Sequence, residues 1–497
     1  MNRVYASRPI IQYLTVNFIV SRMYAPKKCS KIMQSIMAVG VACTFGFSTP
    51  AWAEMILDLE QAIALVLKQN RSVRQSSDRL GLDANSIVAV QSDFKTQISP
   101  DAIIGVQNGK DASSYGFKVV RRFYNGTELV TRIANEKFGS DDGRSNRVSV
   151  EWRQPLLANA GRLVNEEPLV RAQQSSLSNR RSYELTRVSV VLQVISLYYE
   201  MIRLQQQTRA DKKTIDRLTA LFKASKAKES LGWTTRVDTL RVELQLSEAR
   251  SRQNSNQDLL RSAARQFSEI LAMPLNTTFK LKPPPTFELE ITDEKLAIKT
   301  ALKNRLDFAQ VLQDFEDANR GVKIAKKRLK PALQLVTRYT RADDFVFFDN
   351  SLGSNNRWSL QLTSNTDFHR RREKAEFRNA SIEEDAASQA IEIARQSIIR
   401  EVRDRLTSYR LNRRNLTLAE SSYDRAESRL KLARRLFDIG RETQFTVSDA
   451  EEAFLQTENQ LLLNQARVSV SGYQALEAMG LLIETPKELR PDVYPRI

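Results

Sequence analysis

The stretch Gly232-Trp233-Thr234-Thr235-Arg236-Val237-Asp238-Thr239-Leu240 has a counterpart 208 residues later, which begins Gly440-Arg441-Glu442-Thr443-Gln444-Phe445. A second pattern follows each glycine, as Ala272-Met273-Pro274-Leu275 and as Ala478-Met479-Gly480-Leu481. Upstream, Ala297-Ile298 lies 235 residues after Ala62-Ile63. Solenoid repeats have periods of about 20–50 residues, far shorter than these offsets. The sequence therefore predicts a duplicated half, so that the chain contains the same architecture twice.

Residues 1–53 are predicted to be a secretory signal peptide. Three lysines at 27, 28 and 31 precede an apolar run over 32–47, and Ala51-Trp52-Ala53 follows. A basic region, a short apolar region and an A-x-A site are the parts of such a signal, and the run is too short for a spanning helix. Met23 and Met33 are alternative starts. A lipoprotein signal cleaved before Cys43 is the alternative, although Gly40 stands where that signal carries a large apolar residue.

The composition of the mature chain excludes several classes of site. Cleavage after residue 53 removes both cysteines, Cys29 and Cys43, together with six basic residues, which lowers the formal charge from +18 to +12. The single histidine, His369, cannot build a typical zinc site without cysteines. No nucleophile motif or phosphate-binding loop occurs. We expect no enzyme activity, no metal and no cofactor, and the interleaving of basic with acidic residues along helices predicts a solvated face and no nucleic-acid partner.

Each half is predicted to hold a long antiparallel helical hairpin that turns at its glycine. From 161 to 230 the only proline is Pro168, and an apolar heptad seam predicts coiled-coil packing over this segment. Its members are Leu185, Val188, Leu192, Ile195, Tyr199 and Ile202. The segment 369–438 contains neither glycine nor proline. Second helices are expected over 235–271 and 443–479, since glycine ends helices readily in the left-handed conformation.

Two polar, glycine-containing segments, 101–157 and 332–368, are predicted to contribute two strands each. Apolar and polar residues alternate in both, as in Val148, Val150 and Trp152 against Ser149, Glu151 and Arg153. Turns are expected at Gly105–Gly116 with a loop near 141–143, and at 349–356, and Pro100 and Pro331 stand just before the strands. Four strands cannot close a barrel, so alternation alone leaves two interpretations open. The strands belong to a membrane barrel shared between chains, or to a small sheet on the body of a soluble periplasmic protein.

The order of these parts resembles the TolC family of outer-membrane efflux channels over nearly all of 55–485. A signal peptide is followed by a first repeat (54–285) that ends in Pro283-Pro284-Pro285, by a second repeat (286–485) and by a C-terminal tail (486–497). At the hairpin tip the family carries a glycine, Ser/Thr at +3, Asp at +6 and Leu at +8. Gly232, Thr235, Asp238 and Leu240 match all four positions, while Gly440 and Thr443 match two, with Asp449 at +9.

The resemblance implies a mainly α homotrimer whose duplicated hairpins form an α-barrel. Four strands per chain would give a 12-stranded β-barrel in outer-membrane lipid, above a helical tunnel in the periplasm. Such channels conduct substrate passively in tripartite efflux or type I secretion systems. Their tips, here Leu231-Gly232-Trp233 with Thr235 and Ile439-Gly440 with Thr443, dock on a periplasmic adaptor that connects to an inner-membrane pump.

The family's gate lies near these tips, and the resemblance assigns it here to Asp238, Arg441 and Asp449. The chain departs from the family at Phe437 and Glu442, where a tyrosine and an arginine are usual, and at Thr446, where an aspartate is usual. A Gly-Gly expected after the last strand is replaced by Thr366-Asp367-Phe368-His369-Arg370, which puts that strand-to-helix turn in question.

Two other classes are weighed against this interpretation. A soluble periplasmic coiled-coil adaptor also has a signal and a helical hairpin, but it carries one hairpin between β domains and not two hairpins separated by strands. An exported enzyme has no supporting motif. The cargo of a channel cannot be read from this sequence, because drugs, metal ions and secreted proteins all pass through channels of this kind.

Overall fold

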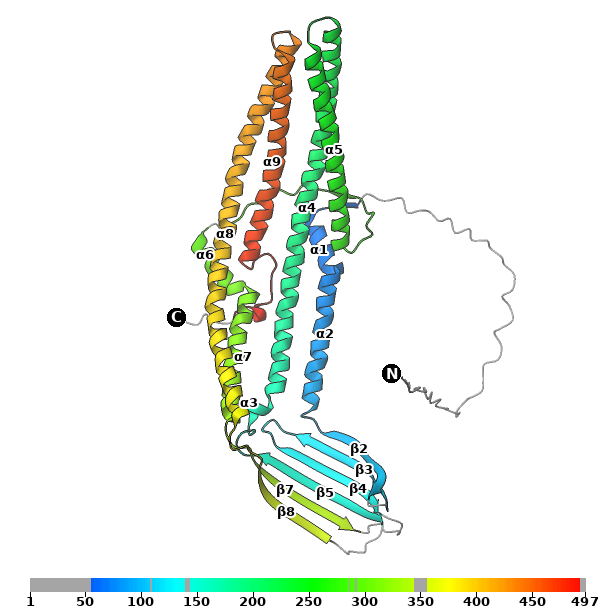
Figure 1. Cartoon of the computed structure of the whole chain (residues 1–497), viewed down its shortest axis with the longest axis vertical. Helices are drawn as coiled ribbons and strands as arrows, with labels where there is room; N and C mark the ends of the chain where they lie inside the picture. Colours follow the sequence, from blue (N-terminus) through cyan, green and yellow to red (C-terminus); the bar gives the residue numbers. More distant parts are fainter. Residues whose placement is uncertain are drawn as a thin grey trace, which may run out of the picture. The chain divides into compact units, whose positions relative to one another are not determined.

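Both predicted hairpins form, and each turns at its glycine (Figure 1). The computed structural model describes residues 55–107, 110–138, 144–285, 287–290, 293–343 and 355–491, so the predicted signal peptide and the loop 141–143 lie outside the described residues. The first hairpin consists of α4 (Glu167–Ser230) and α5 (Arg236–Ile270), and the second of α8 (Arg371–Asp438) and α9 (Gln444–Ala478). Gly232 has φ +75° and Gly440 φ +74°, a left-handed backbone that glycine adopts without steric cost.

The duplication extends through the helices that precede the strands. Helices α1 (Leu59–Gln69) and α2 (Arg71–Ser92) recur 235 residues later as α6 (Glu294–Asn304) and α7 (Leu306–Arg328). Their capping residues recur as well, because the side chains of Asp58 and Asp293 both accept an N–H from the first helical turn. One pair of equivalent residues differs from the pair matched in the sequence analysis. Ala272, with φ +54°, corresponds to Gly480, with φ +69°, and not to Ala478, so this offset is 208 residues like that of the tips.

The core of each repeat forms where the second helix of its hairpin returns to the helical body. In the first repeat, β1 (Met55–Leu57) and β6 (Phe279–Leu281) pair in parallel, and the buried Tyr198 hydroxyl lies 3.1 Å from the Leu57 carbonyl oxygen and 2.8 Å from that of Lys282. In the second, the Tyr409 hydroxyl accepts the Leu289 N–H at 3.0 Å. These tyrosines tie the linking segments 282–290 to the long helices.

The predicted heptad seam of α4 is only partly buried. Ile195, Tyr199 and Ile202 lie in the core, whereas Leu185 is exposed. Helix α4 packs on α5, α2, α1 and α9, so its core residues occupy more than the single stripe of a two-stranded coiled coil. An apolar stretch of α4 is long enough to cross a membrane, but this packing accounts for it.

The large sheet has six strands, which corrects the predicted four. Its order is β2-β3-β4-β5-β7-β8, and every neighbouring pair is antiparallel. The strands are β2 (Gln97–Gln107), β3 (Lys110–Arg122), β4 (Glu128–Phe138), β5 (Arg144–Pro155), β7 (Leu333–Asp343) and β8 (Asn355–Ser364). The prediction of two strands in 101–157 was wrong because Gly105 and Gly116, taken as turn residues, lie inside β2 and β3. Pro100, expected before the strands, also lies within β2.

The two extra strands explain the unequal offsets of the repeat. Equivalent residues before the strands are 235 apart and those after them 208 apart, so the first repeat has 27 more residues in between. The hairpin of β3 and β4 occupies 110–138, about this length. The insertion is therefore a complete β-hairpin in the first repeat.

The two strand-to-helix turns use different residues for a left-handed backbone. Before α3 (Arg162–Asn165) this residue is Gly161, with φ +83°, and before α8 it is Arg370, with φ +46°. A non-glycine residue in this conformation costs about 1–2 kcal/mol. Arg370 takes the left-handed position where the Gly-Gly was expected, and its guanidinium donates to the Leu329 carbonyl.

The predicted C-terminal tail is in contact with the helical body as far as it is described. A short helix, η1 (Lys487–Leu489), follows α9. The Leu489 carbonyl accepts from Arg181 at 3.1 Å, and Arg490 donates to the Asn304 side chain at 3.0 Å. The tail thus joins α4 of the first repeat to α6 of the second.

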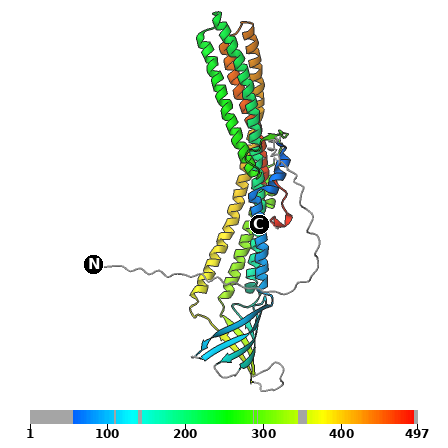
Figure 2. The same ribbon diagram turned by 90° about the vertical axis from the view of Figure 1, so that its right-hand side faces the viewer.

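The strands and the tips stand at opposite ends of the long helices, as both views show (Figures 1 and 2). Strand β5 ends just before α3 and α4, and the 64 residues of α4 lead to Gly232. At 1.5 Å per residue such a helix is about 96 Å long. The sheet and the tips are therefore separated by most of the length of the molecule.

The close approach of β3 and β4 gives a test of the six-stranded sheet. A Cβ at Gly116 would lie 1.8 Å from the Ile133 carbonyl oxygen, whereas one at Gly105 would meet nothing within 4 Å. We expect Gly116→Ala to destabilise the protein by about 1–3 kcal/mol through overpacking against backbone. Gly105→Ala, the matched control, should be neutral or slightly stabilising. Thermal unfolding in detergent measures both, and equal midpoints would contradict the observed register.

Candidate functional site at the hairpin tips

The two hairpin tips have the same local structure. The Trp233 N–H donates to the Lys228 carbonyl at 2.9 Å, and the Arg441 N–H donates to the Leu436 carbonyl at 2.8 Å. These bonds close the last turn of α4 and of α8 around the left-handed glycine. Thr235 and Thr443 cap the returning helices, since their hydroxyls accept the N–H of Asp238 and of Thr446. The tip residues predicted for docking are thus those that build the turns.

The tips also expose large apolar side chains. Trp233 is 75% exposed, and Leu231 and Ile439 project beside the two glycines. Phe445 and Val237 extend this surface onto the first turns of α9 and α5. Scattered exposed apolar residues are ordinary, but a group of them at the end of a polar hairpin is typical of a contact surface. We call Leu231, Trp233, Val237, Ile439 and Phe445 the tip surface.

Asp238, a predicted gate residue, is held by its own helix terminus. The Thr235 hydroxyl donates to the Asp238 carboxylate at 2.6 Å, and Arg241 lies 3.7 Å from it. The hydrogen bond from Thr235, more than the charge of Arg241, lowers the pKa of Asp238. Its carboxylate is therefore ionised at neutral pH.

The three predicted gate residues are not joined to one another within the chain. Among the ion pairs of the described residues none links Asp238 to Arg441, and Arg441 is exposed. Asp449 pairs with Arg429 of α8.

Contacts between the two tips involve Asp238 only through its backbone carbonyl, and otherwise residues that the sequence analysis did not assign to the gate. The Lys228 ammonium lies 3.6 Å from the Phe437 ring centroid and donates to the Phe437 carbonyl at 3.3 Å. The Gln444 side chain donates to the Asp238 carbonyl at 3.1 Å, and Arg241 lies over the Phe445 ring at 5.0 Å. The sequence did hold a sign of this contact, because Phe437 stands where the family usually has a tyrosine. A phenyl ring lacks the tyrosine hydroxyl but still offers its face to a cation.

A buried ionic cluster joins the hairpins farther from the tips. Glu451 of α9 is 4% exposed and accepts hydrogen bonds from Arg217 of α4, at 3.0 Å, and from Arg434 of α8. Arg217 also lies 5.3 Å from the Phe454 ring. Burial lowers the pKa of Arg217 and of Arg434, but both guanidinium groups stay charged at any physiological pH. Removing one partner would leave a buried charge uncompensated, which typically costs 3–5 kcal/mol.

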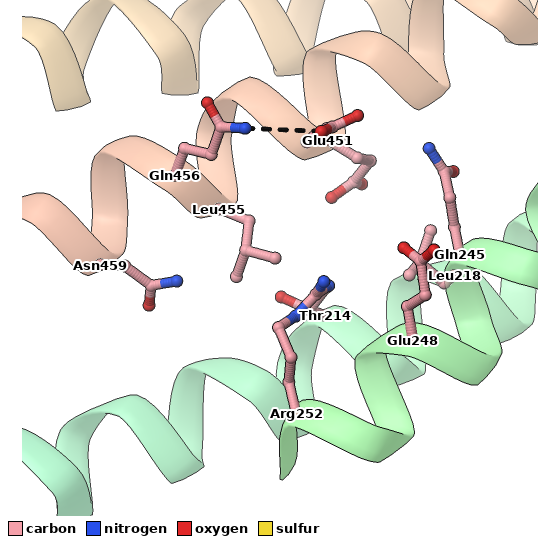
Figure 3. A pocket seen from close by; sticks show the side chains of 10 residues that line it. Thr214, Leu218, Gln245, Glu248, Arg252, Glu451, Leu455, Gln456 and Asn459 are labelled. Atoms are coloured by element: carbon pink, nitrogen blue, oxygen red, sulfur yellow. Dashed lines mark hydrogen bonds between the residues drawn. The ribbon is translucent and has the colours of Figure 1, made fainter. Parts of the chain in front are cut away.

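A cleft separates the hairpins beside this cluster. Side chains from α4, α5 and α9 line it, and most of those drawn in Figure 3 are polar or charged. They include Thr214, Gln245, Glu248, Arg252, Glu451 and Asn459. Because polar side chains lose little when water reaches them, the hairpins can separate here at lower cost than across an apolar core.

Two carboxyl groups near the cleft are less acidic than usual. Burial raises the pKa of Glu458 on α9 and of Asp211 on α4, and Asn256 donates to Asp211 at 2.7 Å. A raised pKa means that the folded state favours the neutral form, so these groups stabilise the fold less as the pH rises through their titration. In the described part of the chain, no group of three His, Cys, Asp or Glu residues is placed to hold a metal ion.

Comparisons with known proteins identify the fold that carries these tips. The family model described as "Outer membrane efflux protein" matches residues 297–479, from α6 to the end of α9. The chain has the fold of an outer-membrane efflux channel. The match, together with the fold, confirms the predicted resemblance to the TolC family of outer-membrane efflux channels.

Solved structures share the efflux-channel fold at low sequence identity. The CmeC outer membrane channel of Campylobacter jejuni is 13% identical with a TM-score of 0.66, over 86% of this chain and 87% of that one. The open state of the MtrE outer membrane channel of Neisseria gonorrhoeae is 14% identical with a TM-score of 0.64, over 85% and 89%. The outer membrane protein VceC of Vibrio cholerae is 13% identical with a TM-score of 0.64, over 85% and 96%. No curated protein matches the chain.

Proposed function

We propose that the chain is the outer-membrane channel of a tripartite efflux or type I secretion system, and that it works as a homotrimer. The observation that carries this proposal is the exposed apolar face of the sheet. Exposed residues on this face include Ile104, Phe117, Trp152, Trp358 and Leu360. Water disfavours such a face, whereas lipid accepts it. A soluble periplasmic adaptor, the alternative, would have to cover this face with protein.

Fractionation tests the location and the stoichiometry together. The channel is expected in the outer-membrane fraction, and native mass measurement in mild detergent should give three copies. The number three comes from the resemblance to the family, and the need for further copies comes from the two edges of the described sheet, which only further strands can satisfy in lipid. A monodisperse monomer that stays soluble without detergent would reject the channel and favour the adaptor.

The tip surface is proposed to dock on a periplasmic adaptor. Gly232→Val and Gly440→Val each force a side chain into the left-handed region, at a strain of about 1–2 kcal/mol. Neither new Cβ would meet another atom within 4 Å, so the change acts on the turn alone. Efflux should fall while membrane insertion stays normal.

Trp233→Ala perturbs the tip less than the glycine variants, because it removes exposed contact area and leaves the turn intact. It should weaken adaptor binding without changing the thermal midpoint of the isolated channel. Unchanged efflux in both glycine variants would argue against docking at the tips.

The periplasmic gate is proposed to close through Asp238 and Arg441 of facing hairpins. Arg441 is exposed and Asp238 is ionised, and a partly solvated pair of this kind contributes about 0.2–1 kcal/mol. Three copies act together at the constriction of a trimer. Asp238→Ala and Arg441→Ala should each raise single-channel conductance in a planar bilayer, and the double variant should add little, since either change breaks the link.

Asp449 is proposed to form an acidic ring that favours cations. Its ion pair with Arg429 reduces the effective charge of that ring. Asp449→Asn should therefore lower cation preference without opening the pore, and Arg429→Gln should raise it. If Asp238→Ala leaves conductance unchanged, closure rests on the contacts of Lys228 with Phe437 and of Gln444 with Asp238.

A further inference from the structure

The inserted hairpin of β3 and β4 has the same two faces as the rest of the sheet. Register partners share a face, and the register places Tyr115 and Phe117 of β3 and Ile133 of β4 on the face of Ile104 and Trp358. All five side chains are exposed. Every charged residue on this face lies within three residues of a strand end, as Arg121, Lys137 and Arg341 do. The central band of this face carries no charged residue on any of the six strands, and most of its residues are apolar.

The opposite face of the inserted strands is charged and paired with their neighbours. Arg132 of β4 lies 2.6 Å from Asp101 of β2, an ion pair that passes over Gly116 of β3. Glu128 of β4 lies 3.2 Å from Arg153 of β5, and Glu151 of β5 lies 2.8 Å from Arg338 of β7. The charged face therefore continues from β2 to β7 through the inserted strands.

The turn of the inserted hairpin is built into the helix end of the sheet. The Asn125 carbonyl accepts the Gly161 N–H at 2.8 Å, and the Tyr124 ring stacks on Phe94 with centroids 4.5 Å apart. Gly126, with φ +92°, has the Asn165 side chain and Pro155 within 3 Å of its Cβ position. The hairpin is thus anchored to the segments that enter and leave the sheet.

The sheet is left with two free edges of matching length and opposite direction. Among the described residues, β2 and β8 each have a single neighbour, and they contain 11 and 10 residues. Strand β2 runs away from the helices and β8 runs toward them (Figure 1). Because six is an even number, β8 of one chain meets β2 of the next in the antiparallel sense of the rest of the sheet.

We propose that three chains close one 18-stranded barrel, in which β8 of each chain pairs with β2 of the next and the inserted hairpins supply six strands of the wall. The occupant of each free edge is a second copy of this chain. The proposal rests on the proposed trimeric channel and adds the strand number and the pore size. Closure of β2 onto β8 within one chain would give six strands, and a barrel of eight strands has room only for packed side chains. The charged face, with Arg132, Arg153 and Arg338, does not fit such an interior.

The strand number sets the width of the pore through the membrane. With strands about 4.8 Å apart and tilted by about 40°, a 12-stranded barrel is about 24 Å across and an 18-stranded barrel about 36 Å. The cross-section is about twice as large in the second case, before side chains are counted. A barrel of this width, lined by the charged face, admits solutes as wide as a polypeptide segment. Selection of solutes by size would then take place at the helical end.

Cysteine labelling tests whether the inserted strands belong to the wall. Phe117 and Lys118 are neighbours on β3 that face opposite sides, and Leu360 and Gln361 of β8 are the matched control pair. The two native cysteines, Cys29 and Cys43, are replaced by serine. In proteoliposomes of the full chain, a water-soluble maleimide should label Lys118→Cys at least about tenfold faster than Phe117→Cys, because lipid protects the apolar face. Equal, fast labelling of both, with normal protection at Leu360→Cys, would place the hairpin outside the wall and overturn the proposal.

Cross-linking tests the pairing of β8 with β2. Ile103→Cys on β2 is combined in turn with Ser359→Cys, Gln361→Cys and Thr363→Cys on β8, all on the charged face that water reaches. A short bifunctional maleimide should give covalent dimers and trimers on a denaturing gel for at least one combination. Ser149→Cys with Thr340→Cys, register partners within one chain, is the positive control.

The outcomes separate this proposal from the proposed function. Cross-links confined to single chains, or none where the control pair reacts, would overturn the 18-stranded barrel while an outer-membrane trimer in the fractionation keeps the channel. Covalent dimers without trimers would mean that two chains close a 12-stranded barrel, which also overturns the proposal. A soluble monomer would reject the channel itself, and the inference with it.

Discussion

Backbone hydrogen bonding at the two free edges of the six-stranded sheet constrains the rest of this structure. In the part of the chain that the structure describes, strands β2 and β8 each have one neighbour, and the apolar face between them is open to the surroundings. Unpaired N–H and C=O groups cost several kcal/mol each in hydrocarbon. A sheet with this pattern is therefore stable in a membrane only when the edges are paired. The alternating faces, the even number of strands and the opposite directions of β2 and β8 are all compatible with pairing to further copies.

The helical part is packed differently along its length. Around the middle of the long helices each repeat has a large apolar core, which contains Tyr198 in the first repeat and Tyr409 in the second. Toward the tips the cores become small, and polar contacts connect the hairpins to one another. The pair of Arg217 with Glu451 fixes α4 against α9, while the polar cleft beside it lowers the cost of separation. This gradient from apolar to polar packing suits a body that is rigid at its middle and adjustable at the tips.

The duplicated architecture tolerates an insertion at one place. Helices, caps and tip turns recur at constant offsets, whereas β3 and β4 occur only in the first repeat. An antiparallel hairpin can be added to a sheet without changing the direction of any other strand. The insertion also preserves the two faces, as the pairs of Arg132 with Asp101 and of Arg153 with Glu128 show. Strands can thus be added to the sheet while the order and the packing of the helices stay the same.

The sequence determined the elements whose formation depends on local chemistry. The glycine turns, the returning helices and the start of α8 were predicted within about two residues of where they lie, because helix initiation and termination are short-range effects. The first long helix was predicted from 161, and α4 begins at Glu167. The difference between the offsets of 235 and 208 already indicated an insertion of 27 residues in the first repeat. The two extra strands were missed because Gly105 and Gly116 were taken as turn residues.

Tertiary structure alone decided what depends on residues far apart in the chain. A glycine inside a strand cannot be told from a turn glycine by its neighbours in sequence, and Gly116 is required because the β4 backbone crosses close to it. The contact of Lys228 with Phe437 and the ion pair of Arg217 with Glu451 join segments more than 200 residues apart in the chain. Ionic and cation–π contacts leave no periodic trace in a sequence rich in charged residues, so only the packing of the hairpins reveals them.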